Sequence, residues 1–257
     1  MKFYPKALPR ISKPDKRVVT LFLMIYLSLK YSLHFVMAFL LLSACSPSKN
    51  QSEIPIELVE AVRIQAGNPV EGKLVYQSCV VCHGENAEGI QALQAPALVN
   101  TDKLYLYRQL MNFRKGIRGY SEQDTLGKQM AIMAKALNDS LAVSNVVAYI
   151  KTLQEVSVAA TLGGDIRKGE RAYESICGSC HGPGAKGNAL MNAPRLNGLN
   201  DWYLKRQIRH FKSSIRGAHP TDKFGAQMIP MANMLTDEQA IHDVLAYIQS
   251  TALPAAK

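Results

Sequence analysis

Two copies of one cysteine–histidine motif carry the clearest chemistry in this 257-residue sequence. Residues 79–83 and 177–181 both read Cys-x-x-Cys-His, the typical attachment motif of c-type haem. In each copy the two thiols can form thioether bonds to the haem vinyl groups, and the adjacent histidine can take one axial position on the iron. The sequence therefore predicts two covalent haem groups with iron, held by these thioether cysteines and axial histidines: Cys79, Cys82, Cys177, Cys180, His83 and His181.

Zinc binding and thioredoxin-type redox chemistry are the alternatives for a Cys-x-x-Cys pair. A zinc site needs a second pair of thiols or histidines at suitable spacing within each copy, and the sequence offers none. A thioredoxin-like protein would place a β-strand before the motif, whereas the preceding residues here have helical character. Both alternatives are therefore disfavoured.

The second axial ligand should come from a residue that repeats together with the motif. No further histidine does so, because the other candidates align with different residues: His210 with Asn112, His219 with Ser121, and His242 with Ser144. Two methionine pairs do repeat, Met130 with Met228 and Met133 with Met231. A methionine can ligate iron or fill a gap in a core, and the repeat does not choose between the members of each pair. Two filled axial positions would favour electron transfer over catalysis and leave no place for a small-molecule substrate.

Further polar and proline residues repeat near the motif and could support the haem. A ligating histidine normally donates its second N–H to a carbonyl or carboxylate, and the carbonyls of Pro96 and Pro194 are candidates for that acceptor. A simple turn is the alternative. Arginine and tyrosine pairs could contact the haem propionates or merely lie on solvated helix faces: Arg118 and Arg216, Tyr105 and Tyr203, Arg108 and Arg206.

The motif lies within a longer internal repeat. Residues 79–150 align with residues 177–248 at a constant offset of 98, and thirty of the 72 pairs are identical. Upstream the offset is 97, so one residue is inserted before the second motif. The repeat predicts two tandem domains, 67–156 and 165–257, joined by a linker at 157–164. Because domains of this size bury little apolar surface, we expect the haem to complete each core.

The elements of each unit have helical patterns. The first helix is expected to begin near Asn68-Pro69 in one unit and Asp165 in the other, and to run into the haem motif. Helical spacing of apolar residues predicts further helices over 105–113, 202–211 and 141–153, the last with a counterpart that a capping box at Thr236–Gln239 would open. Gly72 and Gly169 should mark where the first helix crosses the last. No alternating apolar run predicts a sheet, so the fold class is all-α.

Composition and charge limit the classes of partner. Hydrophobic residues make up 47% and charged residues 19% of the chain, the balance of an ordinary globular protein. The formal net charge is +10, but residues 1–44 contribute +6 of it. Because no basic stripe is interleaved with aromatic residues, we expect no nucleic-acid partner.

The amino-terminal segment predicts export. Residues 1–44, apolar over 18–29 and 31–44, read as a signal peptide or membrane-targeting segment. Leu42–Cys45 reads Leu-Ser-Ala-Cys, which resembles the bacterial lipobox. That resemblance implies lipidation of Cys45 as the first mature residue, followed by a polar tether at 45–66, on the periplasmic side of a membrane. An uncleaved transmembrane helix is the alternative, although Lys30 interrupts the stretch of about 20 residues that it needs.

Taken together, these motifs resemble class I cytochrome c. The haem motif, Ala-Pro-x-Leu, the methionine before the last helix and Ala-Tyr-Ile near its end carry the resemblance over about residues 68–252. Two such units in tandem resemble the cytochrome c4 group of dihaem electron carriers. The resemblance implies domains packed about a pseudo-twofold axis, with Pro96 and Pro194 as histidine acceptors. It also favours Met130 and Met228 as axial ligands, with Met133 and Met231 as alternatives.

These observations predict electron transfer at the periplasmic membrane face. The expected partners are redox proteins of a respiratory chain: a quinol-oxidising complex or dehydrogenase as donor, and a terminal oxidase or reductase as acceptor. The protein is thus expected to be a carrier and no enzyme. One alternative is a dihaem peroxidase, which would need one open iron. Another is a fixed cytochrome subunit of a larger oxidase or dehydrogenase complex.

Overall fold

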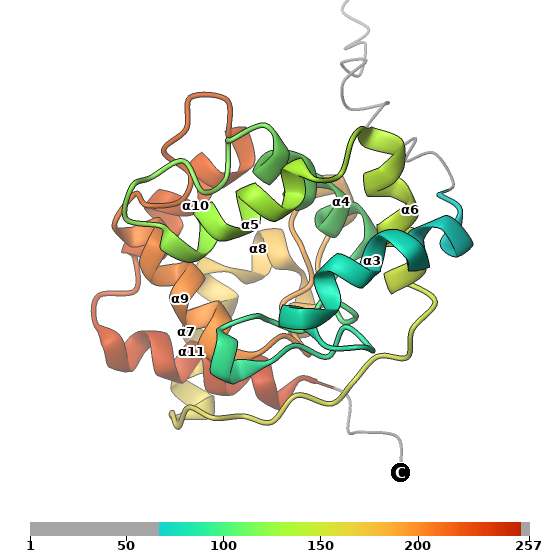
Figure 1. Ribbon diagram of the computed structural model, residues 1–257. Helices are drawn as coiled ribbons and strands as arrows, with labels where there is room; N and C mark the ends of the chain where they lie inside the picture. The colour runs from blue at the N-terminus through green and yellow to red at the C-terminus, as the bar shows by residue number, and fades with distance from the viewer. Residues whose placement is uncertain (1–66, 253–257) are drawn as a thin grey trace, which may run out of the picture. The chain divides into compact units, whose positions relative to one another are not determined.

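The first half of the described region, residues 67–156, folds into four α-helices around the first haem motif. The structure is a computed structural model that describes residues 67–252 (Figure 1). Its elements in this half are α3 (Pro69–His83), the 3-10 turn η1 (Gln91–Leu93), α4 (Lys103–Arg114), α5 (Thr125–Lys135) and α6 (Ser140–Ile150). The predicted segments 1–44 and 45–66, with Cys45, lie outside the described residues.

The second half repeats this order with one break. Its elements are α7 (Ile166–Ile176), α8 (Gly178–His181), η2 (Pro183–Ala185), η3 (Ala189–Met191), α9 (Asp201–Lys212), α10 (Lys223–Asn233) and α11 (Glu238–Ser250). The single helix α3 corresponds to α7 and α8, which are separated at Cys177. The inserted residue lies just before this break, and Gly178, a poor helix former, replaces Val80 after it.

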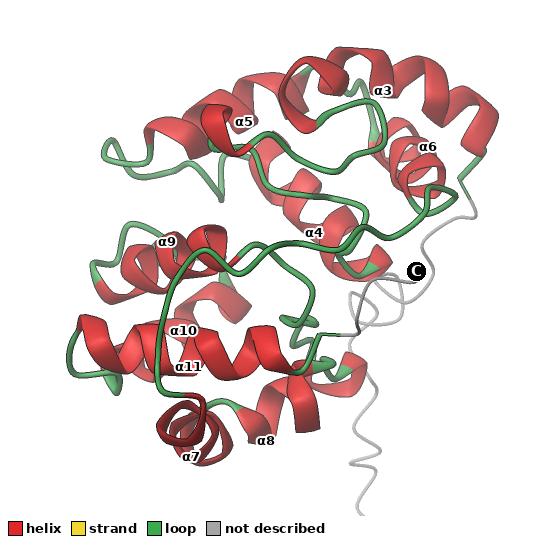
Figure 2. Ribbon diagram, turned by 90° about the horizontal axis from the view of Figure 1, so that it is seen from below, coloured by secondary structure: helices red, strands yellow, loops and turns green. Residues whose placement is uncertain are grey.

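The all-α prediction is confirmed over residues 67–252, where no strand occurs (Figure 2). Two isolated bridges, Ile90 with Ala95 and Asn188 with Ala193, are the β-like contacts of this region. Both bridges close the short turn between the haem motif and the repeated proline, Pro96 or Pro194. The two halves lie within one compact unit of the chain.

Side-chain caps fix where the helices begin. The Asn68 side chain accepts a hydrogen bond from the Val70 N–H, and the Asp165 side chain accepts from Arg167 and Lys168, so both predicted starts are confirmed. The cap predicted at Thr236 is wrong. Asp237 caps α11, since its Oδ1 accepts from Ala240 N at 2.8 Å. A carboxylate at this position also interacts favourably with the positive end of the helix dipole.

Close helix crossings are set by the two predicted glycines. A Cβ on Gly72 would lie 1.9 Å from the Asn145 carbonyl oxygen of α6. A Cβ on Gly169 would lie 1.8 Å from the Asp243 carbonyl oxygen of α11. No side chain larger than hydrogen fits at either place, so the first and last helices of each half approach backbone to backbone. The predicted crossing is confirmed in both halves.

Each half has its own apolar core beside this crossing. In the first half Tyr76 packs with residues of α4 and α6, and its hydroxyl donates to the Gly84 carbonyl at 2.7 Å. In the second half Tyr173 packs with residues of α9 and α11, and its hydroxyl donates to the Gly182 carbonyl at 2.7 Å. These hydrogen bonds tie the turn after each haem motif to its core.

Helices α5 and α10, which carry the methionine pairs, were not predicted. Each begins at an aspartate whose carboxylate accepts from a glycine N–H: Asp124 from Gly127 at 2.8 Å, and Asp222 from Gly225 at 2.9 Å. Pro230 lies inside α10. These helices bring the methionines to the cavity wall facing the haem motif in each half.

Candidate functional site

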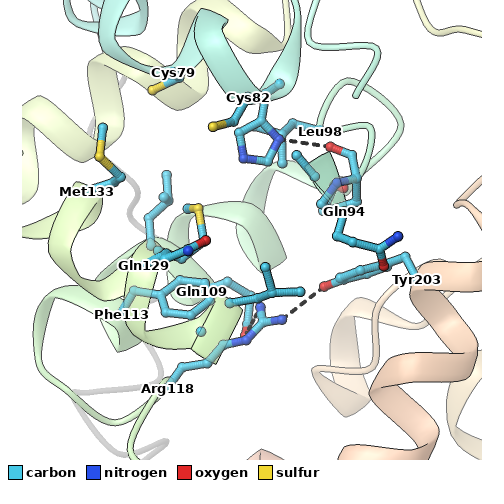
Figure 3. Close-up of a pocket in the computed structure, with 18 of the residues that line it drawn as sticks. Cys79, Cys82, Gln94, Leu98, Gln109, Phe113, Arg118, Gln129, Met133 and Tyr203 are labelled. Atoms are coloured by element: carbon cyan, nitrogen blue, oxygen red, sulfur yellow. Dashed lines mark hydrogen bonds between the residues drawn. The ribbon is translucent and has the colours of Figure 1, made fainter. Parts of the chain in front are cut away.

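A cavity in the first half lies between the haem motif and α5 (Figure 3). Cys79, Cys82 and His83 line one side of it, and Met130 and Met133 line another. Apolar side chains of α4 and of the turn at 93–98 form part of the remaining lining, and residues of the second half, among them Tyr203 and Gln207, contribute as well. The cavity thus gathers every residue that the sequence assigned to covalent attachment and axial ligation of the first haem.

The second half contains the matching cavity. Its walls include Cys177, Cys180 and His181, with Met228 and Met231 contributed by α10. Apolar side chains from α9 and α11 complete the lining. The same chemical groups therefore surround two separate cavities at matched positions of the repeat.

Both motif histidines are oriented by a proline carbonyl. His83 Nδ1 lies 2.9 Å from the Pro96 oxygen, and His181 Nδ1 lies 2.8 Å from the Pro194 oxygen. A carbonyl can only accept, so each Nδ1 carries the proton and each Nε2 keeps its lone pair. Burial lowers the pKa of both histidines more than the carbonyl contact raises it, which favours the neutral ring.

The free nitrogen of His83 provides a direct test of whether a haem fits. Nε2 of His83 is buried and has no hydrogen-bond partner among the described residues. A buried polar atom without a partner is costly, and a metal bond is one way to satisfy it. An apolar cavity, two thiols on one wall and a neutral imidazole with an available Nε2 together fit a covalently attached iron porphyrin.

The more deeply buried thiol of each motif, on Cys79 or Cys177, has the character of a neutral group. Burial raises the pKa of Cys79 and raises that of Cys177 to about 12. Within residues 67–252, no three His, Cys, Asp or Glu side chains gather in a way that could hold a metal ion. Zinc prefers a closed set of thiolate and imidazole ligands, so the local chemistry disfavours a zinc site.

The methionine pairs differ in exposure. Met133 is 44% exposed, whereas Met130, Met228 and Met231 are partly buried. Figure 3 shows Met133 on the side of the cavity near Cys79. Both members of each pair line their cavity, so the assignment of Met130 and Met228 as axial ligands stays a prediction.

Arginines and tyrosines from both halves meet between the cavities. Arg118 donates to Tyr203 Oη at 3.0 Å (Figure 3), and Arg216 donates to Tyr105 Oη at 2.7 Å. Each guanidinium also donates to the side-chain oxygens of the same two glutamines, Gln109 and Gln207, at 2.9–3.0 Å. Sequence reasoning missed these glutamines, although their repetition at the 98-residue offset was a usable signal.

This buried network is strongly cationic. Burial alone would raise the pKa of Tyr203, but Arg118 and Arg216 lower it. Burial opposes the charge on Arg216, but Tyr105 and Tyr203 raise the pKa of its guanidinium. Buried guanidinium groups are best stabilised by anions, and the haem propionates are anions of suitable chemistry. Propionate contacts of Arg118, Arg216, Tyr105 and Tyr203 stay predictions.

A second arginine pair joins the halves in the same reciprocal way. Arg108 donates to the side-chain and main-chain oxygens of Asn192 at 3.0 and 2.8 Å. Arg206 donates to the corresponding oxygens of Gln94, both at 3.0 Å. Because Asn192 and Gln94 occupy matched positions of the repeat, these contacts relate the halves by a pseudo-twofold axis.

Comparison with known proteins agrees with this geometry. The family model for cytochrome c matches residues 69–154 and again residues 166–252. The chain belongs to the cytochrome c family. It carries two cytochrome c domains in tandem, and these imply two covalently bound c-type haems with iron.

Similar proteins include two cytochromes c4 and an electron acceptor of a dehydrogenase. Cytochrome c4 of Azotobacter vinelandii is 25% identical over 72% of this chain and 89% of its own length. A thiosulfate dehydrogenase electron acceptor of Thiomonas intermedia is 31% identical over 63% of this chain and 73% of its own length. The crystal structure of reduced cytochrome c4 from Pseudomonas stutzeri superposes with a TM-score of 0.55 at 23% identity, covering 72% of this chain and 98% of that one.

The predicted family and fold class are thereby confirmed. This cytochrome is a dihaem electron-transfer protein of the cytochrome c4-like group.

Proposed function

We propose that this cytochrome relays electrons at the periplasmic face of a bacterial membrane. Its donor would be a quinol-oxidising complex or a dehydrogenase, and its acceptor a terminal oxidase or reductase. Two relatives support a place between such partners. One is named as the electron acceptor of thiosulfate dehydrogenase, and another, from Sinorhizobium medicae, as the FixP subunit of a cbb3-type cytochrome c oxidase.

The observation that carries the relay is the thin wall between the two cavities. Five residues line both of them: Tyr105, Gln109, Leu199, Tyr203 and Gln207. One layer of side chains therefore separates the two redox sites. Within this layer the arginine–glutamine network is hydrogen-bonded and buried, so little rearrangement is expected when an electron crosses it.

In each site, different residues would attach the haem and ligate its iron. The thiols of Cys79, Cys82, Cys177 and Cys180 would hold the haems, and His83 and His181 would ligate iron through Nε2. Met130 and Met228 would close the second axial positions and exclude small ligands. The bound irons supply one-electron exchange between the ferric and ferrous states, and a neutral thioether ligand favours the ferrous state.

Membrane attachment is the second part of the proposal. The lipobox-like sequence ending at Cys45 supports a lipid anchor. Among the residues that the structure describes, no helix is long and apolar enough to cross a membrane. Changing Cys45 to Ser should move the protein from the membrane to the soluble fraction in cell fractionation. Unchanged retention of the variant would contradict the lipid anchor and favour an uncleaved helix.

The relay is tested on the purified dihaem protein. We expect two low-spin haems per chain by absorption and electron paramagnetic resonance spectroscopy. The ferric methionine–iron band should integrate to both irons. Membranes that contain a quinol-oxidising complex should reduce both haems, and an oxidase should reoxidise them. A high-spin haem that turns over peroxide would overturn the relay and favour the dihaem peroxidase.

A fixed oxidase subunit is the second candidate, because of the similarity to FixP. That relative is 27% identical over 57% of this chain and 58% of its own length. Solubilisation in mild detergent separates the two possibilities. A carrier should elute alone on gel filtration, whereas a fixed subunit should co-elute stoichiometrically with an oxidase.

A further inference from the structure

The peptide that orients each motif histidine is also held from the opposite half of the molecule. The Pro96 carbonyl accepts from His83, and the N–H of the same peptide, on Ala97, donates to Asn200 Oδ1 at 3.0 Å. Asn200 lies at the start of α9 in the second half. A continuous hydrogen-bonded path therefore runs from Asn200 through one peptide to the imidazole of His83.

The second half shows the reciprocal path. The Pro194 carbonyl accepts from His181, and the following N–H, on Arg195, donates to Asp102 Oδ2 at 2.6 Å. Asp102 lies at the start of α4 in the first half. Asp102 and Asn200 occupy matched positions of the repeat, so the two paths differ chiefly in their final acceptor, a carboxylate in one and a neutral amide in the other.

Neither acceptor side chain caps the helix that it precedes. Asp102 and Asn200 are the N-cap residues of α4 and α9, where Asp and Asn side chains normally accept from the first turn of their own helix. Neither makes such a bond. Both side chains instead reach across to the opposite half, which indicates that the inter-half contact determines their orientation.

A planar peptide transmits polarisation from its N–H to its carbonyl. Hydrogen bonds in a chain strengthen one another, so an acceptor on the N–H makes the carbonyl oxygen a better acceptor. A stronger bond from Nδ1–H to that oxygen raises the basicity of the imidazole as a metal ligand. A carboxylate should produce this effect more strongly than an amide, because charge-assisted bonds are roughly twice as strong as neutral ones.

We propose that Asp102 and Asn200 are positioning residues that tune the axial histidine of the opposite domain, Asp102 more strongly than Asn200. The inference rests on the proposed ligation of iron by His83 and His181. Asp102 increases the basicity of His181, stabilises the ferric state of the second haem and lowers its reduction potential. Asn200 increases the basicity of His83 in the same way, but to a smaller extent. Each haem is thus electronically linked to the domain that it does not occupy.

The repeat offers a reciprocal exchange as the experiment. Asp102→Asn gives the second haem the acceptor of the first, and Asn200→Asp gives the first haem that of the second. Redox titration of the dihaem protein, followed by nuclear magnetic resonance, reports each potential and each Nδ1–H resonance separately. We expect Asp102→Asn to raise the potential of the second haem and move the His181 Nδ1–H resonance upfield. Asn200→Asp should lower the potential of the first haem and move the His83 resonance downfield.

Glu155→Gln is the matched control for charge alone. Glu155 accepts from the Arg195 side chain at 2.8 Å, whereas the main-chain N–H of Arg195 donates to Asp102. Glu155→Gln should leave the His181 Nδ1–H resonance unshifted. The proposal is overturned if Asp102→Asn and Glu155→Gln have equal effects, or if either exchange leaves its histidine resonance unmoved. Wild-type haems that lack histidine ligands would instead refute the ligation on which the proposed function rests.

Discussion

At the scale of single residues, the repeat keeps the groups predicted to attach and ligate each haem, and it varies residues that lie behind them. Cys-x-x-Cys-His, the proline carbonyl and both methionines are identical in the two halves, whereas Asp102 and Asn200 differ. The first set is fixed by the chemistry of attachment and ligation, which is the same for both haems. The second set can diverge, because it acts through a peptide and changes ligand strength without removing the ligand.

The methionine assignment gives the prediction at this scale. Replacing Met130 or Met228 with Ala should open the sixth position of one iron and remove the thioether that favours Fe(II). The potential of that haem should fall by roughly 0.1–0.3 V, a part of the range of about 0.8 V that axial ligands set. The methionine–iron band should lose half its intensity, which absorption spectroscopy of the ferric protein measures.

Met133→Ala and Met231→Ala are the controls for this assignment. Their side chains line the same cavities, so a general loosening of the pocket would appear in these variants too. They should keep both methionine–iron bands. If they alone lose a band, the ligand is the second methionine of each pair.

At the scale of helices, the sequence predicted the elements that have a clear start signal or helical spacing of apolar residues. Helices α3, α4 and α6 and their counterparts fall in this group. Helices α5 and α10 were missed, because glycine lies in the first turn of each and Pro230 interrupts the second. These residues are local signals against helix, and capping by Asp124 and Asp222 together with packing over the cavity overrides them. The cap predicted at Thr236 was wrong for a different reason: the adjacent Asp237 can also cap α11, and the structure uses Asp237.

The glycine crossings give the prediction at this scale. Gly72→Ala should destabilise the protein by about 2–3 kcal/mol, because overpacking outweighs the gain of about 1 kcal/mol in helix propensity. The added methyl would lie 1.9 Å from the Asn145 carbonyl oxygen of α6, so the two helices must separate. Denaturant unfolding of the dihaem protein measures the change.

Gly163→Ala serves as the control for the crossing, because a Cβ at Gly163 would meet nothing within 4 Å. Its free energy of unfolding should change by no more than about 0.5 kcal/mol, as is usual at exposed positions. A Gly72→Ala protein as stable as the wild type would contradict the prediction, because it would show that α3 and α6 can move apart without loss of stability.

At the scale of the whole molecule, the interface between the halves could not be read from the sequence. Periodicity identifies faces, but the partners of Arg118 and Arg216 in the opposite half lie 85–111 residues away in the chain. Only the folded arrangement shows that these arginines bind the tyrosines and glutamines of the opposite half. The duplicated sequence makes these contacts reciprocal, so each arginine contact across the interface occurs twice.

Replacing Asn100 tests how strongly this interface holds the segment between the two halves. Its buried amide donates to the Gly198 carbonyl of the second half at 2.6 Å and exchanges two hydrogen bonds with Val156, after α6. Asn100→Ala would leave these main-chain groups unpaired and should cost about 2–4 kcal/mol, since each buried unpaired group costs about 1–3 kcal/mol. Local opening should then speed protease cleavage within residues 157–164, measured against exposed Asn138→Ala. Equal cleavage of the two variants would mean that other contacts hold this segment.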